Sequence, residues 1–316
     1  MRQSFLLFFL LVNNLLVNGQ VSFHPTVKYM KISSGAQRLY GEGNVIKSAL
    51  TYDTLFTTFK NEGYRTDKYY AACVWALTGN KDKAFFYLQQ VITTNEWVNL
   101  PNILSDTDLD TLHSDKRWQP LIDKVIERNK IPEAKLDKPL ISLLDSIFIE
   151  DQRDRQNLSV VENKYGVQSN EIDSLWNKIR HQDAINLAQV TNIIDTRGWL
   201  GPSVIGQQGA STLFYVIQHA DSTMQVKYLP LMKAAVKRGD ALPQNLALLE
   251  DRVLTFQGEM QIYGSQIKED SAGRKSIIPI IDEANVDIRR ASVGLGPLED
   301  FAAYFGIKYV LPKKKK

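Results

Sequence analysis

The side chains best suited to chemistry gather in the stretch from Arg197 to Gln266. His219 stands in the string Gln-His-Ala-Asp, which ends at Asp221, and Asp251 follows two predicted helices later. A histidine beside a carboxylate is a common pair for general acid–base catalysis. The candidate catalytic residues are therefore His219, Asp221 and Asp251, with Asp151 as a further acid that could pair with the histidine.

Other side chains, in this stretch and on either side of it, could hold a ligand. Arginines bind anions through paired hydrogen bonds, an aromatic ring can stack on a sugar, and amide or phenol groups can hydrogen-bond a sugar or a peptide. The candidate ligand-binding residues are Trp199, Gln218, Arg252, Gln261, Tyr263, Gln266, Arg155, Arg289 and Arg290.

A buried polar network would explain the same residues without any ligand. His219 would then be satisfied at a helix end and Asp221 would cap the next helix. The sequence leaves three alternatives open, which are a structural network, a ligand pocket and an enzyme. In each of them we expect three strings to converge in space, namely Gln218–Asp221, Asp251-Arg252 and Gln261–Gln266.

Several other kinds of site lack their sequence signals. The four histidines are scattered, and no His-Glu-x-x-His or Gly-x-Ser-x-Gly string occurs. Asp106, Asp108 and Asp110 alternate as in a calcium loop, but the glycine and the glutamate of such a loop are missing, so we expect helix caps. The single cysteine, Cys73, lies in a helical pattern and should be buried. We expect no metal and no cofactor.

Two segments near the start of the chain repeat with an offset of 36 residues. The second copy has small, aromatic and glycine positions at Ala72, Trp75, Gly79 and Ala84, then Leu88 and Val91. These positions resemble a tetratricopeptide repeat, whose two helices cross closely at small residues. The corresponding residues of the first copy are Ala36, Leu39, Gly43, Ser48, Tyr52 and Leu55.

The rest of the chain has the apolar periodicity of helices. A helix from about Gln207 is apolar on nearly every side, which predicts a central position. Asp270 to Gly273 indicates a β-hairpin. The predicted fold is mainly α, with tetratricopeptide-like helical hairpins followed by a helical domain with a small β-hairpin. The predicted divisions are a signal peptide (1–19), a repeat segment (20–130), a linker (131–139), the helical domain (140–311) and a basic tail (312–316).

From about residue 140 to 305 the chain resembles an uncharacterised bacterial domain family of unknown function. The resemblance rests on an ordered set of strings, and it implies no activity. The strings are Asp151 with Arg155, Trp199 with Gly201, Gln218 to Asp221, Asp251-Arg252, Gln261 with Tyr263, Gly264 and Gln266, and Arg289-Arg290 with Gly294-Leu295.

The two ends of the chain bear on location and partners. Arg2, the apolar run Phe5–Val12 and the small residues Val17 and Gly19 predict a signal peptide cleaved after Gly19, with no transmembrane segment in the mature chain. Without the last four lysines, 34 basic residues face 35 acidic ones, which is not the basic balance of a nucleic-acid-binding protein.

These patterns favour an exported, periplasmic or secreted, binding or interaction protein with a polar pocket or network in its second domain. The helical repeats would dock on another protein, as its partner, or on the chain's own second domain. The alternative is a hydrolase-like enzyme that acts on an envelope or extracellular substrate, with His219 as general acid or base.

Overall fold

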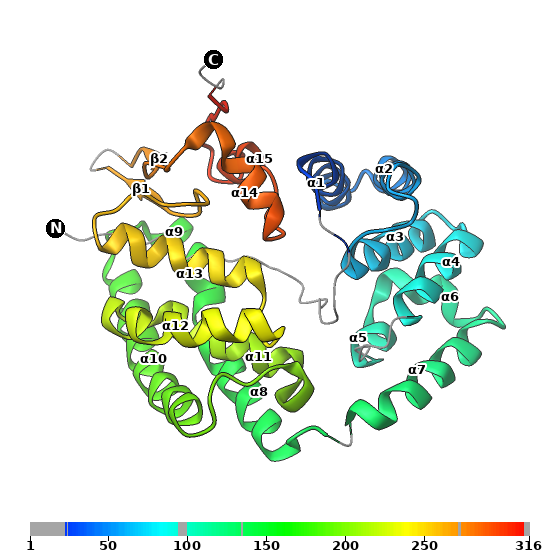
Figure 1. Ribbon diagram of the computed structural model, residues 1–316, viewed down its shortest axis with the longest axis horizontal. Helices are drawn as coiled ribbons and strands as arrows, with labels where there is room; N and C mark the ends of the chain where they lie inside the picture. Colours follow the sequence, from blue (N-terminus) through cyan, green and yellow to red (C-terminus); the bar gives the residue numbers. More distant parts are fainter. Residues whose placement is uncertain (1–22, 24, 94–99, 134, 271–272, 313–316) are drawn as a thin grey trace. The chain divides into compact units, whose positions relative to one another are not determined.

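The computed structural model describes residues 23, 25–93, 100–133, 135–270 and 273–312. These residues are mainly helical and include a two-stranded antiparallel hairpin, which confirms the predicted fold class (Figure 1). The predicted signal peptide at 1–19 and the four lysines of the predicted tail lie outside the described residues. Among the described helices, none combines the length and the apolar character needed to span a membrane.

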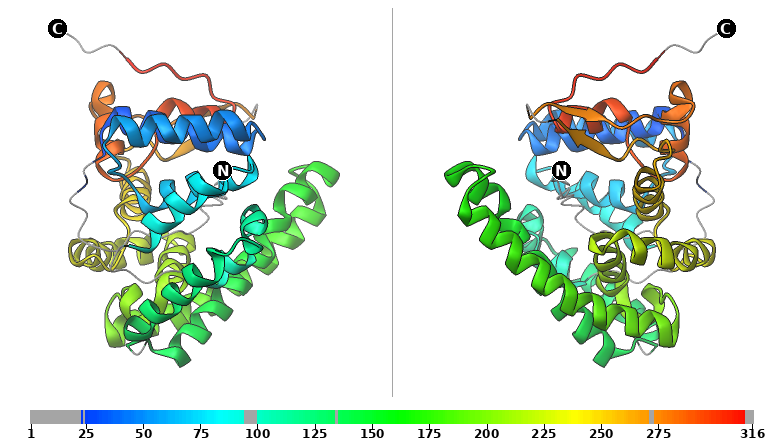
Figure 2. Two further views of the ribbon diagram at one scale, coloured as in Figure 1. Left: turned by 90° about the vertical axis from the view of Figure 1, so that its right-hand side faces the viewer. Right: turned by 90° about the vertical axis from the view of Figure 1, so that its left-hand side faces the viewer.

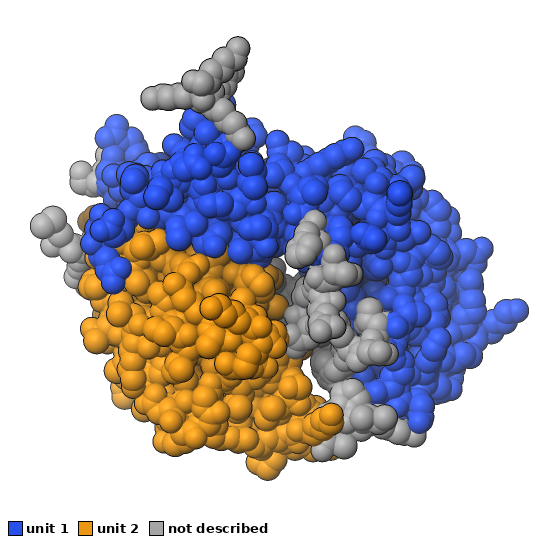
Figure 3. All heavy atoms as spheres, viewed as in Figure 1, with its two compact units in different colours: residues 1–134, 257–316 blue, residues 135–256 orange. Residues whose placement is uncertain are grey.

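The chain divides into two compact units (Figure 3). Unit 1 comprises residues 1–134 and 257–316, and unit 2 comprises residues 135–256. The predicted domain at 140–311 is thus shared between the units. Helices also enter the predicted linker from both sides, because Pro139 stands in the first turn of a helix, where a missing N–H loses no hydrogen bond.

Unit 1 begins with two helical hairpins, followed by shorter helices. The hairpin helices are α1 (Val27–Gly41), α2 (Val45–Thr58), α3 (Arg65–Leu77) and α4 (Lys81–Ile92). The helices that follow are α5 (Leu100–Ser105), η1 (Thr107–Leu109), α6 (Asp110–His113) and α7 (Trp118–Glu133). Helix α1 packs on α2, α2 on α3, and α3 on α4, so the two hairpins stack in sequence order.

The two hairpins match at equivalent positions 36 residues apart. Gly43 and Gly79 each have a left-handed backbone, with φ of 77° and 82°, at the turn between the two helices. The small residues of both copies are fully buried where the helices cross, and in the first hairpin the Ser48 hydroxyl donates to the Ala36 carbonyl oxygen at 2.8 Å. The equivalent residues of the second hairpin, Ala72 and Ala84, are also fully buried.

The C-terminal part of unit 1 packs on these hairpins. Helix α14 contacts α1, and Ala291 on α14 is buried in the core that the hairpins form. The Ser34 hydroxyl on α1 donates to Asp300 at 2.6 Å. The elements of this part are β1 (Ile267–Glu269), β2 (Lys275–Ile277), η3 (Glu283–Asn285), α14 (Val286–Ser292) and α15 (Leu298–Tyr304).

Unit 2 is entirely helical, and its longest helix is α10 (Figure 2). Its elements are α8 (Lys138–Arg153), η2 (Arg155–Asn157), α9 (Leu158–Tyr165), α10 (Asn170–Arg197), α11 (Pro202–His219), α12 (Ser222–Arg238) and α13 (Pro243–Phe256). Helix α11 contacts α8, α10 and α12. It therefore has the central position that its apolar surface predicts. It starts earlier than expected, and its break at Gly206 (φ 65°) coincides with the predicted start.

The close crossing of α8 and α11 sets their register. A Cβ atom added at Gly209 would lie 3.1 Å from Leu144 Cδ1, so glycine permits this approach. The Thr212 hydroxyl donates to the Leu144 carbonyl oxygen at 3.3 Å. Seven residues further along each helix, about two turns, come Asp151 and His219. The two helices therefore run in the same direction and bring these side chains together.

Candidate functional site

The candidate site in unit 2 centres on the ring of His219 and the carboxylate of Asp151. His219 is the last residue of α11, and Asp151 lies in the last turn of α8. The distance from Nδ1 of the ring to Oδ1 of the carboxylate is 3.0 Å. The side chains are 8% and 1% exposed, respectively, so this contact is almost wholly shielded from solvent.

Arg155 joins the same network from the short helix η2. Its Nη1 donates to the main-chain oxygen of Asp151 at 2.9 Å and lies 3.6 Å from the Asp151 carboxylate. Its Nη2 donates to Asp183 Oδ2 on α10 at 2.8 Å. The remaining carboxylate oxygen of Asp151, Oδ2, accepts a hydrogen bond from Gln152 Nε2 at 2.6 Å. The network therefore links α8, η2, α10 and α11.

The surroundings of His219 determine which ring nitrogen carries the hydrogen. Burial lowers the pKa of His219, and this effect exceeds the opposing attraction of Asp151. Burial acts to raise the pKa of Asp151, but the hydrogen bond from His219, the charge of Arg155 and the hydrogen bond from Gln152 hold it below its usual range. At pH 7 a neutral ring thus faces an ionised carboxylate, which can only accept. Nδ1 must therefore carry the hydrogen, and Nε2 is left as an acceptor.

Arg252 meets Gln218 as the sequence predicts. Arg252 Nη1 on α13 donates to the main-chain oxygen of Gln218 at 3.0 Å, and Gln225 Nε2 donates to the same oxygen at 3.0 Å. Burial lowers the pKa of Arg252 to about 10. Asp251 is fully buried beside it in sequence. The strings Gln218–Asp221 and Asp251-Arg252 therefore converge, as expected.

Two further candidates in unit 2, Asp221 and Trp199, contribute to the fold. Asp221 is the N-cap of α12, where its side chain accepts a hydrogen bond from Met224 N at 3.0 Å. Trp199 is 3% exposed and belongs to the core of unit 2, and its carbonyl oxygen accepts a hydrogen bond from Arg238. The ring of Trp199 is thus packed among core residues.

The third string, Gln261 to Gln266, belongs to unit 1. Gln261 is fully buried, and its side chain closes the loop by donating to the Gln266 and Ile278 carbonyl oxygens while accepting from Gln266 N at 2.8 Å. The Gln266 side chain donates to Ser265 Oγ at 3.0 Å. The amide of Gln261 thus takes the place of main-chain partners in this loop.

Arg289 and Arg290 hold the same loop from α14. Arg289 Nε donates to the Ile262 carbonyl oxygen at 2.9 Å, and Arg290 Nη1 donates to that of Tyr263 at 2.8 Å. Both guanidinium groups therefore bind main-chain oxygens, a structural use of residues that are also candidates for holding an anion.

Sequence reasoning missed Asp183 and Gln152 as members of the unit 2 network. A signal for Asp183 exists in the sequence. It stands four residues after Ile179 and four before Leu187, so it interrupts the apolar stripe of a long helix on its buried side. An acid in that place requires a partner in the core, and Arg155 supplies it. Gln152, one residue from Asp151, has no comparable signal.

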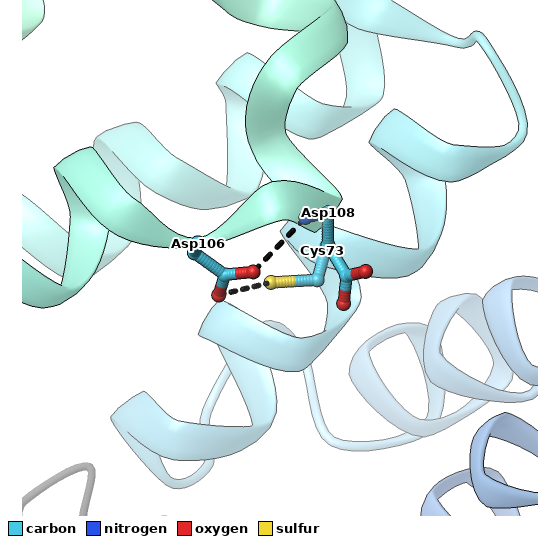
Figure 4. A group of neighbouring side chains, drawn as sticks. All are labelled: Cys73, Asp106 and Asp108. Atoms are coloured by element: carbon cyan, nitrogen blue, oxygen red, sulfur yellow. Dashed lines mark hydrogen bonds between the residues drawn. The ribbon is translucent and has the colours of Figure 1, made fainter.

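A second group of possible ligand atoms lies in unit 1, at Cys73, Asp106 and Asp108 (Figure 4). Cys73 is buried, as expected, and its thiol lies 3.6 Å from Asp106 Oδ2. Burial raises the pKa of Cys73, so the thiol keeps its proton. Asp106 caps η1 by accepting from Asp108 N at 3.0 Å, the capping role that the sequence predicts.

Of these two groups, the unit 2 network is better suited to catalysis or metal binding. A carboxylate that orients a neutral histidine prepares Nε2 to accept a proton. One ligand atom from each of Asp151, Asp183 and His219 also lies within 4.8 Å of the other two, a grouping that could hold a metal ion.

Comparisons with known proteins bear on the same region. A model described as a family of unknown function, DUF6624, matches residues 136–314, more than half of the chain. All of the candidate site residues fall within this match. No curated protein and no solved structure matches the chain. The chain therefore belongs to the DUF6624 family, whose function is unknown.

Proposed function

We propose that this chain is an exported binding protein that recognises another protein through the two stacked hairpins of α1 to α4. The observation that carries the proposal concerns Leu50 on α2 and Phe86 on α4, which occupy the same position of the 36-residue repeat. Their side chains are 53% and 50% exposed. Two equivalent helices thus present a large apolar group to solvent.

The exposed apolar residues lie on the side of each helix that faces away from the core. Neighbouring apolar residues are fully buried, among them Tyr52 on α2 and Leu88 on α4. Leu50 has a further exposed apolar neighbour one turn earlier, Ile46. Burying a side chain of this size against a partner contributes about 1.5–3 kcal/mol. Such residues are therefore suited to anchor a protein interface.

Site-specific photo-crosslinking in cells tests this proposal. A photoreactive amino acid replaces Phe86, and a matched control replaces Gln89, which is exposed on the same helix. We expect position 86 to crosslink to one discrete protein and position 89 to give much less of the same product. Equal products from both positions, or none from position 86, would exclude a binding surface there.

Export is the second part of the proposal. It rests on the sequence pattern at residues 1–19. N-terminal sequencing of the protein recovered from outside the cytoplasm should begin at Gln20. Recovery of the intact N-terminus from the cytoplasm would contradict export.

A second candidate function is acid–base catalysis at His219, and the 3.0 Å contact with Asp151 favours it. The proposed role is to take a proton from a water molecule that attacks an envelope or extracellular polymer. A panel of ester, amide and glycoside substrates tests it with the wild type, His219→Gln and His181→Gln. His181 is exposed on α10 and serves as the matched control. Hydrolysis that His219→Gln retains would rule out this role.

A further inference from the structure

The two carboxylates of the unit 2 network share one feature. Each has one oxygen held by a neighbouring donor, since Gln152 donates to Asp151 Oδ2 and Arg155 donates to Asp183 Oδ2. The other oxygen of Asp183, Oδ1, is buried and has no hydrogen-bond partner among the described residues. The other oxygen of Asp151 faces the ring of His219. A buried acceptor without a donor is costly, so Asp183 Oδ1 points to a missing partner.

When a carboxylate binds a metal ion through one oxygen, a hydrogen bond to its other oxygen fixes its orientation. Gln152 and Arg155 fulfil that role here. The ligand atoms of Asp151, Asp183 and His219 lie within 4.8 Å of one another, so a modest contraction would bring them around one ion. The side chain of Asp183 is 21% exposed, which gives an ion a route from solvent to the buried pair.

We propose that Asp151, Asp183 and His219 bind one divalent transition-metal ion of the Zn²⁺ class. Metal ligation takes carboxylates in their ionised form and imidazole in its neutral form, with no hydrogen on the coordinating nitrogen, so an ion held at Nδ1 beside Asp151 requires the ring hydrogen to move to Nε2. This mixed oxygen and nitrogen set suits a borderline ion such as Zn²⁺. Three protein ligands leave at least one coordination position open for water or another ligand.

Arg155 sets the expected strength of this site. Its guanidinium lies 3.6 Å from the Asp151 carboxylate and 2.8 Å from Asp183 Oδ2, and its positive charge opposes a second cation. An imidazole that coordinates a metal ion is neutral, however, so Asp151, Asp183 and Arg155 then carry one net negative charge between them, which still attracts a cation. We therefore expect binding that is saturable and weaker than at a site without an arginine.

This inference does not depend on partner binding by the hairpins. It shares residues with the acid–base proposal, but its test measures ion binding instead of turnover, so the two can fail separately. The experiment uses the full chain, freed of metal with a chelator, in a Cys73→Ala background that removes the thiol of the other ligand group. Zn²⁺ is titrated by calorimetry, and the visible absorption of Co²⁺ reports the ligands.

We expect one Zn²⁺ per chain and a Co²⁺ spectrum distinct from that of the aqueous ion. Asp183→Asn should weaken binding by more than about tenfold, as loss of a ligand should cost at least as much as loss of an outer-shell partner. Glu171→Gln, an exposed change on the same helix, should leave binding unchanged. Circular dichroism checks that both variants fold. No saturable binding, or equal binding by the Asp183→Asn and His219→Gln variants and the parent, would overturn the proposal.

Discussion

His219 and Asp151 are 68 residues apart in sequence, yet Nδ1 of the ring lies 3.0 Å from the carboxylate. Helices α8 and α11 pack closely where Leu144 meets Gly209. Asp151 and His219 both lie C-terminal to this point on helices that run in the same direction, so their side chains meet. The contact therefore depends on the packing of two helices and belongs to the core of unit 2. Its energetic consequences can be measured without knowledge of a ligand.

Arg155 should be essential to the stability of unit 2. Replacing it with methionine, Arg155→Met, removes the donors to the Asp151 carbonyl and to Asp183 and leaves a buried carboxylate without its cation. We expect a loss of about 3–5 kcal/mol in the free energy of unfolding. Denaturant unfolding followed by circular dichroism measures it.

Arg153→Met is the matched control for this change. Arg153 lies two residues earlier and pairs with Glu150, but its side chain is 57% exposed. An exposed ion pair contributes about 0–1 kcal/mol, so this variant should unfold almost as the wild type does. Equal losses of unfolding free energy for both variants would mean that the buried network contributes no more to stability than the exposed ion pair does.

His219 should make stability depend on pH. Its pKa in the folded protein lies below that of the unfolded chain because burial disfavours the charged ring. The unfolded state therefore binds more protons, and stability that is present above about pH 6.5 is lost as the pH falls from that value through the lower pKa of the folded protein. The slope from this one group cannot exceed about 1.4 kcal/mol per pH unit.

His219→Gln tests this dependence through the slope alone. Unfolding free energies between pH 5 and pH 8, in the range where an ordinary histidine titrates, should fall less steeply with decreasing pH in the variant than in the wild type. His181→Gln, an exposed change, serves as the control. Identical slopes for wild type and His219→Gln would show that the ring titrates alike in both states.

Gly264 should be required in the loop that Gln261 closes. Its φ is 71°, and an added Cβ atom would lie 2.7 Å from Ile280 Cδ1 and 3.0 Å from Leu298 Cδ1. Gly264→Ala combines backbone strain with overpacking and should cost about 2–4 kcal/mol. Thermal unfolding of the full chain measures the loss.

Gly258→Ala separates these two causes. Gly258 also has a left-handed backbone, with φ of 80°, but an added Cβ atom there meets nothing within 4 Å. Only the backbone strain of about 1–2 kcal/mol should remain. If Gly264→Ala costs no more than Gly258→Ala, the side chains of Ile280 and Leu298 do not restrict the loop.

Local signals in the sequence predict much of the fold. Asp221 caps the helix that it was expected to cap, and its side chain accepts a hydrogen bond from Met224 N, three positions later. Asp151 on α8 and Arg155 on η2 are both buried, where the spacing of the apolar residues before them along the chain places them. Capping and periodicity act within one helix, so they can be recognised without knowledge of its neighbours.

The members of the site were harder to predict because they depend on contacts between helices. The partner of His219 proved to be Asp151, whereas Asp221 is a helix cap and Asp251 is buried in α13. Arg289 and Arg290 were candidates for holding an anion or for a structural network, and they bind carbonyl oxygens of their own unit. Which acceptor an arginine reaches is decided by chain crossings, which residue spacing does not encode.

The central proposal, that the hairpins bind another protein, is tested most directly by the crosslinking yield from position 86 in a chain that also carries Leu50→Lys. Leu50 and Phe86 occupy equivalent positions of adjacent hairpins. A charge at position 50 should therefore lower the affinity for a partner that contacts both residues by about tenfold or more. We predict that the crosslinked product falls accordingly while circular dichroism shows an unchanged fold. An unchanged yield would contradict a common binding surface.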